Sequence, residues 1–268
     1  MSLSERDCRD LWEAVELLEN PSFLIELASK LGVPLEKLMN RLPGSASAMI
    51  NRATHVALRR AMDLAAGSVS LSRPGADTTA LHRRMVTVTG AAGGFFGLMG
   101  LSVELPVTTT LMLRSIAEIA RSQGEDLTDP VARMECMKVF ALGSPKASDD
   151  AAESGYYAIR AGLAQGVERF LQKGGGRFVG DLLAKIAARF EGTVLERVAA
   201  SGVPILGAAG GAAINRLFIN HFQKMARGHF TVRRLERAHG TGPVREAYDS
   251  LRTGGPCPPG PVIDVTPV

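Results

Sequence analysis

Aromatic side chains are scarce in this sequence, and their scarcity limits the fold. They make up only 5% of the 268 residues, whereas apolar residues as a group reach 46%. Strands draw on aromatic and β-branched side chains, while small apolar residues let helices pack closely. The composition therefore disfavours a β-sandwich and predicts an all-α fold, a multi-helix globular bundle.

Cysteine is too scarce and too scattered for a disulfide framework or a zinc site. Cys8, Cys136 and Cys257 lie far apart and form no CxxC pair, which is typical of a reducing compartment. The first residues include acidic side chains and lack the apolar core of a signal peptide. We therefore expect a cytoplasmic protein without a metal ion, peripheral at the inner membrane if its apolar segments meet lipid.

The chain also lacks the common catalytic signatures. It contains no GxSxG, HExxH or Cys-His pattern, and its glycine-rich residues 90–100 lack the Lys-Ser/Thr ending of a phosphate-binding loop. No reaction is predicted, enzymatic activity stays open, and we expect no cofactor.

Net charge is small, and the basic residues are unevenly placed. The formal charge is +4, with arginines gathered at residues 227–237 and paired at 59–60 and 83–84. Such clusters suit anionic lipid headgroups or nucleic acid, and a solvated helix face is the alternative. We expect a membrane surface and no nucleic acid as partner.

Two long stretches are almost without charge, and they are the main feature to explain. Residues 85–113 hold one charged side chain, Glu104, and residues 198–215 hold none. The string Gly-Ala-Ala-Gly-Gly occurs at 90–94 and again at 207–211. We predict two glycine-rich apolar helical hairpins that are related as a pseudo-repeat. The first would have arms at 79–98 and 106–121 and a turn near Gly100, because Pro106 must kink or restart the helix.

The first stretch is long enough to cross a bilayer, but its composition is unusual for that role. It is rich in Gly, Ala and Thr, and it contains Glu104 and Pro106 in its interior. A central carboxylate costs a few kcal/mol on insertion scales. Three interpretations stay open: a buried core hairpin, which we favour, reversible membrane contact, and a true span.

Length and punctuation predict one large helical domain, residues 1–253. It divides into N-terminal helices at 2–76, the first apolar hairpin region at 77–143 and a second helical region at 148–240. Helix-starting and helix-breaking residues predict well-defined helices at 4–20, 46–66, 130–143 and 207–237, the first with Trp12 on its apolar face. The Gly- and Pro-rich residues 254–268 predict a disordered tail.

Glu104 is the most conspicuous candidate for a binding role. A carboxylate inside an apolar stretch must be paired, protonated or functional, because burying it uncompensated is costly. Capping of a helix that begins at Pro106 is the structural alternative. The candidate ligand-binding residues are four groups at the mouth of a lipid pocket and three arginines facing headgroups: Glu104, Thr108, Arg114, Asn215, Arg227, Arg233 and Arg234.

Other polar residues have simpler explanations. The threonines after Pro106 are expected to bond back to helical carbonyls. Asp149 and Asp150 could bind a divalent ion, but capping the next helix is favoured. Asn215 and His229 recur on one side of a predicted helix, where we expect a satisfied polar layer in the bundle.

Four strings carry a family resemblance. They are Gly-Ala-Ala-Gly-Gly-Phe-Phe-Gly at 90–97, Val-Glu-Leu-Pro-Val-Thr-Thr-Thr and the residues after it at 103–117, and the segments 207–215 and 229–236. With these the sequence resembles the EcsC family of bacterial proteins from about residue 20 to 237. The family is named for a protein encoded beside an ABC-transporter pair, so the resemblance implies an association with membranes and transport. It supplies no catalytic residues.

These observations leave three hypotheses for function. The first is a non-catalytic, amphitropic protein that binds lipid or a fatty acyl ligand, or associates with a membrane. The second is a metal-dependent hydrolase using Glu104, Asp149, Asp150 or His221. The third is a scaffold that docks an ABC transporter.

Overall fold

The computed structural model describes residues 3–19, 44, 46–66, 79–143, 155–173, 177–201 and 207–257. The structure describes only the helical backbone, without side chains, for residues 79–100, 177–179 and 207–211. The described residues form eight helices and no strand, so the prediction of an all-α fold is confirmed. The helices are α1 (Glu5–Glu19), α4 (Ala46–Ala66), α6 (Thr79–Ser122), α7 (Pro130–Leu142), α8 (Tyr156–Lys173), α9 (Arg177–Ser201), α10 (Gly207–His239) and α11 (Thr241–Arg252).

Local capping chemistry sets several helix ends where the sequence predicts them. At the start of α1 the Ser4 hydroxyl accepts from the Asp7 amide at 3.1 Å and donates to the Asp7 carboxylate at 2.7 Å, a capping-box arrangement. Asp129 caps α7 by accepting from the Val131 amide at 2.8 Å, and Pro130 takes the first helical position.

The predicted hairpins are not confirmed. Residues 79–122 are assigned to the one element α6, which contains both Gly100 and Pro106, so the division into two arms at Gly100 is not confirmed. Proline removes one hydrogen bond from the helical ladder, a local cost that helix packing along α6 can offset. The two Gly-Ala-Ala-Gly-Gly strings occupy different places, the first inside α6 and the second at the start of α10.

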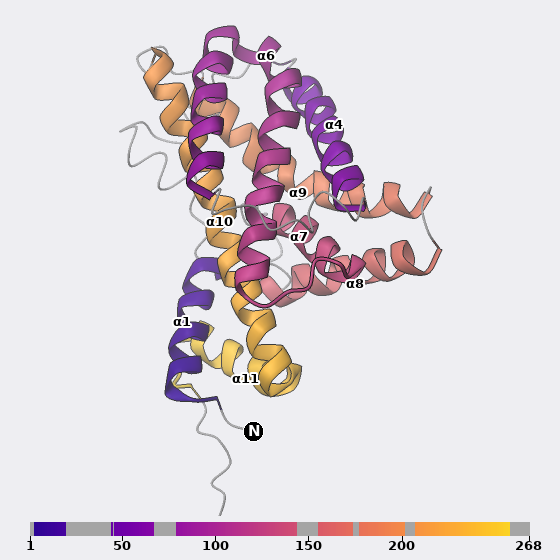
Figure 1. The fold of residues 1–268 in the computed structure, drawn as a ribbon, viewed down its shortest axis with the longest axis vertical. Coiled ribbons are helices and arrows are strands. Elements are labelled where there is room, and N and C mark those ends of the chain that lie inside the picture. The colour runs from indigo at the N-terminus through magenta and orange to yellow at the C-terminus, as the bar shows by residue number, and fades with distance from the viewer. Residues whose placement is uncertain are drawn as a thin grey trace, which may run out of the picture.

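Two long helices, α6 and α10, form the centre of the arrangement. They share the most extensive helix–helix contact, and α4 packs against both α6 and α9. Figure 1 shows α10 running along most of the length of the molecule, with α6 beside its N-terminal half and α1 and α11 beside its C-terminal half. The helices α7, α8 and α9 pack against one another on the other side of this centre.

Most of the aromatic side chains that the structure describes lie in the core. Phe140 of α7, Phe190 of α9 and Phe222 of α10 are fully buried, with ring centroids 5.2–5.6 Å apart. Phe218 extends the cluster, 5.2 Å from Phe222. Edge-to-face pairs of this kind add to the burial energy. A small number of rings therefore joins three helices.

Helix α1 packs closely on α10 at a glycine. A Cβ atom added at Gly228 would lie 2.7 Å from Cγ of Leu18 and 3.2 Å from the Ala14 carbonyl oxygen. Leu11, Ala14, Val15 and Leu18 form the buried face of α1. Trp12, which the sequence pattern places on this face, is instead 52% exposed, because it lies one position outside the 3.6-residue apolar stripe.

We expect Gly228→Ala to destabilise the protein by about 1–3 kcal/mol, because the new methyl group overpacks the α1–α10 contact. Chemical denaturation of the purified variant measures this loss. The matched control is Gly162→Ala in α8, where an added Cβ meets no atom within 4 Å. That control should be neutral or stabilising by up to about 1 kcal/mol, since alanine favours helix; equal effects at the two sites would contradict the close contact.

The C-terminal segment and the cysteines differ from expectation. Cys8 and Cys257 form a disulfide with a Cα–Cα distance of 6.1 Å, and Cys136 is free and buried. Amides of Gly254 and Gly255 bond to carbonyls at the end of α11. Residues 254–257, assigned from sequence to the tail, are thus tied to α11 and α1. Sequence spacing alone could not reveal this pair, because its two cysteines are 249 positions apart.

Candidate functional site

Glu104 is paired inside the protein. Its carboxylate accepts a short hydrogen bond from a guanidinium nitrogen of Arg197 on α9, and the two side chains are 11% and 6% exposed. The Arg197 guanidinium also lies over the ring of Phe218 on α10, 5.1 Å from the centroid. The capping interpretation is wrong, because Glu104 lies within α6 and not at a helix start. The Glu104–Arg197 pair therefore links α6 to α9, and Arg197 extends the link to α10.

Because Glu104 is turned inward, the outward side of α6 carries no charge over about three turns. Ser102, Val103 and Val107 are exposed there, and the next exposed residue along the helix is Arg114. Val103 is 71% exposed and Val107 is 40% exposed. An outward stripe that carries no charged side chain between Leu101 and Arg114 is unusual for a surface helix, whose outer face is normally charged.

The four residues predicted for the mouth of a lipid pocket differ in their burial. Thr108 lies one turn after Glu104 on α6, and Asn215 lies one turn before Phe218 on α10; both are fully buried. Thr110 donates to the Pro106 carbonyl at 2.8 Å, as expected, but within the described residues the buried hydroxyls of Thr108 and Thr109 have no hydrogen-bond partner. Arg114 is exposed at the other end of the segment and does not join this group.

Arg233 and Arg234, expected to face headgroups, pair with carboxylates inside the protein. Arg233 forms a bidentate pair with Glu125 at 2.8 and 3.1 Å. Arg234 pairs with Asp10 of α1 at 2.5 Å. Arg227 is exposed. The basic cluster near residue 230 therefore attaches α10 to its neighbours, and internal carboxylates account for much of its charge.

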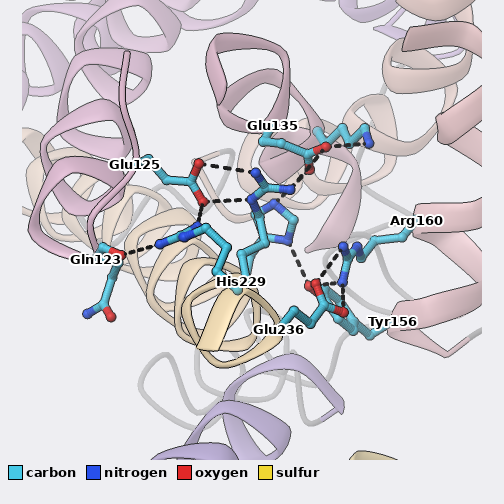
Figure 2. Close-up of polar contacts among 10 residues, drawn as sticks. Gln123, Glu125, Glu135, Tyr156, Arg160, His229 and Glu236 are labelled. Carbon is cyan, nitrogen blue, oxygen red and sulfur yellow. Dashed lines mark hydrogen bonds and ion pairs between the residues drawn. The ribbon is translucent and has the colours of Figure 1, made fainter. Parts of the chain in front are cut away.

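A buried relay of hydrogen bonds surrounds His229, as Figure 2 shows. Its Nε2 lies 3.1 Å from the Glu135 carboxylate of α7, and its Nδ1 lies 2.9 Å from the Tyr156 hydroxyl of α8. A carboxylate can only accept, so Nε2 carries the proton and the Tyr156 hydroxyl donates to Nδ1. Arg160 donates in turn to the Tyr156 oxygen at 3.2 Å.

Burial decides the charge states in this relay. Desolvation lowers the pKa of His229 to about 4 against the attraction of Glu135, so the imidazole is neutral near pH 7. Burial would raise the pKa of Glu135, but His229, Lys138 and Arg233 outweigh it and hold that pKa well below its usual value. Burial also raises the pKa of the Tyr156 phenol, so it stays protonated.

Further ion pairs continue the relay on both sides. Arg160 binds Glu236 of α10 through two bonds of 2.8 and 2.9 Å, and Tyr157 donates to the same carboxylate at 3.0 Å. On the other side Arg237 joins Arg233 on Glu125. Burial would raise the pKa of Glu125, but the two arginines hold it below its usual value. We name these nine residues the His229 cluster: Glu125, Glu135, Lys138, Tyr156, Tyr157, Arg160, His229, Arg233 and Glu236.

The His229 cluster is a structural feature that the sequence only partly indicates. The expected satisfied polar layer on α10 is confirmed at His229, but its partners come from α7 and α8. Three consecutive helical turns of α10 supply His229, Arg233 and Glu236, a polar face at 3–4-residue spacing that could have been recognised. The partner positions could not, because they depend on how separate helices meet.

Glu196 of α9 is a buried carboxyl group of a different kind. It is 5% exposed, and among the described residues it forms no hydrogen bond or ion pair. Desolvation alone raises its pKa to about 8, so the group is largely protonated near neutral pH. The folded protein binds this proton between about pH 4.5 and 8, where the unfolded chain releases it, so Glu196 lowers stability as pH rises through that window.

We therefore expect Glu196→Gln to stabilise the protein at pH 8 by roughly 2–4 kcal/mol and to have little effect at pH 4.5. Denaturant unfolding at both values measures the difference. Glu168→Gln on the exposed side of α8 is the control and should be neutral at both. If Glu196→Gln destabilised the protein equally at both pH values, the carboxyl group would be stabilising the fold through a partner, and the proposed desolvation cost would be contradicted.

The geometry does not assemble the predicted metal-dependent hydrolase from its described residues. His221 bonds through Nε2 to the Gly143 carbonyl at 2.8 Å, whereas Glu104 bonds to Arg197. Within the described part of the chain, no group of three His, Cys, Asp or Glu residues is arranged to hold a metal ion. Asp149 and Asp150 lie outside the described residues.

A groove of about 670 Å³ lies along the exposed face of α4. Its lining includes Arg52, His55, Arg59 and Arg60, together with the partly exposed Val56. These positions recur at three- and four-residue spacing on the side of α4 opposite its buried alanines. Among the described helices, none combines the length and apolarity that crossing a bilayer requires.

These features define a class of protein, an all-helical bundle with buried ion pairs and an uncharged exposed segment on one central helix. The model of the EcsC protein family matches residues 23–235, most of the chain, and the protein belongs to this family. The chain matches no curated protein and no solved structure.

Proposed function

We propose that this protein is amphitropic: it associates reversibly with an anionic membrane surface through the outward side of α6 and the adjacent helix α4. The observation that carries the proposal is that the residues of α6 exposed between Leu101 and Arg114 are all uncharged, because Arg197 pairs with Glu104 inside the protein. They are Ser102, Val103 and Val107. Exposed apolar surface of this kind is typical of interaction sites when it is contiguous.

The neighbouring helix supports a bilayer as the partner. Helix α4 packs along α6 and exposes Met49 and Val56 together with Arg52, Arg59 and Arg60. Apolar side chains that enter the headgroup region, combined with basic side chains beside them, are the usual basis of reversible binding to anionic membranes. Internal lipid uptake has less support, because Glu104, Arg233 and Arg234 are occupied by internal ion pairs.

Vesicle flotation tests the proposal. We expect the wild-type protein to float with vesicles of phosphatidylcholine and phosphatidylglycerol, and Val103→Glu to weaken binding at least about tenfold, because a charge replaces the valine that would enter the bilayer. Val103 is too exposed for this change to disturb folding. The matched control is Val131→Glu on α7, 37% exposed, which should bind like wild type.

Other outcomes decide between the alternatives. Flotation that occurs only when an ABC transporter is present in the vesicles would replace membrane binding by the scaffold function. Equal flotation of wild type, Val103→Glu and Val131→Glu would show that the outward side of α6 is not the contact surface.

A further inference from the structure

The groove on α4 differs from the basic cluster near residue 230, because among the described residues its arginines form no internal ion pair. Arg160, Arg197, Arg233 and Arg234 each form an ion pair with a carboxylate of another helix or loop. Within the part of the chain that the structure describes, the three groove arginines form no such pair. They are Arg52, Arg59 and Arg60.

Helix geometry brings these groups to one side. Arg52, Val56 and Arg59 are four and three residues apart, so they follow one another along the same face of α4. Arg60 and His55 lie beside them, and Asp63 is the single acidic residue in the lining. Three guanidinium groups against one carboxylate leave the groove with an excess of two positive charges.

The shape of the groove favours a specific ligand over a diffuse cloud of counterions. A guanidinium group donates two parallel hydrogen bonds to phosphate oxygens, which fixes geometry as well as charge. Val56 adds an apolar wall between the arginines, and the volume of about 670 Å³ exceeds what a bare phosphate needs. The groove therefore has room for a phosphate that carries a small uncharged organic group.

We propose that the α4 groove is a discrete binding site for a phosphate ester, held by Arg52, Arg59 and Arg60. The assignment of the ester to a lipid headgroup rests on the proposed function. Recognition of the phosphate does not depend on that function. Arg52 and Arg59 bind the phosphate oxygens from positions two turns apart on α4, and Val56, on the turn between them, contacts the glycerol or the first acyl carbons.

Titration calorimetry with glycerol 3-phosphate tests the site without a membrane. We expect saturable binding with one site per chain, weakened by about tenfold in R52Q/R59Q, because each lost charge-assisted bond contributes appreciably. The control R9Q/R169Q removes the same charge from exposed positions on α1 and α8 and should bind within about twofold of wild type. All four substitutions are at exposed positions, and thermal unfolding verifies the fold.

Vesicles then distinguish the two sources of phosphate. Binding of glycerol 3-phosphate together with flotation on anionic vesicles, the latter weaker in R52Q/R59Q than in R9Q/R169Q, identifies a lipid headgroup. Binding of glycerol 3-phosphate without flotation identifies a free ester; the site then stands and the membrane function fails. V103E should no longer float with the vesicles but should still bind glycerol 3-phosphate. Equal effects of the two double variants, or no saturable binding by wild type, would overturn the site.

Discussion

Arg197→Met is expected to lower the free energy of unfolding by about 3–5 kcal/mol, because it leaves the Glu104 carboxylate buried without its cation. The methionine retains much of the arginine volume, so a cavity contributes little to the loss. Urea unfolding at neutral pH measures it. Arg169→Met, on the exposed side of α8, should change stability by less than about 0.5 kcal/mol.

The double variant E104Q/R197M separates the ion pair from packing. Removing both charges should recover much of the stability, because replacing a buried pair is far less costly than breaking it. The same variants test the role of the pair at the surface. In Arg197→Met the carboxylate gains by rotating outward to water, so vesicle binding should fall, and E104Q/R197M should restore it. If Arg197→Met were as stable as wild type, the buried Glu104 carboxylate would not depend on the Arg197 ion pair for stability.

Acidification is expected to remove about 3 kcal/mol of stability between pH 6.5 and pH 4 through His229 alone. The pKa of this imidazole is about 4 in the folded protein and 6.5 in an unfolded chain. Between those values the unfolded chain binds the proton and the folded protein does not, so stability falls as pH decreases through this window. Glu135, whose pKa is also lowered, adds a loss in the same direction below about pH 4.5.

His229→Gln isolates the contribution of the imidazole. The amide can donate to Glu135 and accept from Tyr156, but it does not titrate. Because Glu196 contributes the opposite slope over the same range, the comparison is made in the Glu196→Gln background. There we expect His229→Gln to lower stability by about 1–2 kcal/mol at pH 7 and to make the dependence between pH 4.5 and 6.5 much flatter. Unfolding free energies measured across that range give both quantities. A slope that survives the substitution would assign the acid sensitivity to another group.

Sequence reasoning succeeds in this protein where one segment decides its own structure. The ends of α1, α4 and α7 follow from local capping and breaking residues, and α10 extends only two residues beyond its predicted end at Arg237. The all-α fold follows from composition in the same way. The predicted hairpin with a turn near Gly100 is not confirmed, because residues 79–122 are assigned to the one element α6.

The site shows the same division. That Glu104 must be paired, protonated or functional follows from its apolar surroundings, but Arg197 lies 93 positions away and could not be named as its partner. Arg233 and Arg234 are indistinguishable from solvated arginines in sequence; only the fold brings Glu125 and Asp10 to them. Residue type therefore predicts where a partner is needed, and tertiary contact decides which residue supplies it.

The most direct test is whether the outward side of α6 enters a bilayer. An environment-sensitive fluorophore attached at V103C reports this contact, with V131C on α7 as the matched site; the free Cys136 is buried and does not compete for the label. On addition of anionic vesicles we predict a blue shift at position 103 with quenching by lipids brominated near the glycerol, and no change at 131. Emission at position 103 that stays as in water, while the protein floats with the same vesicles, would contradict the account.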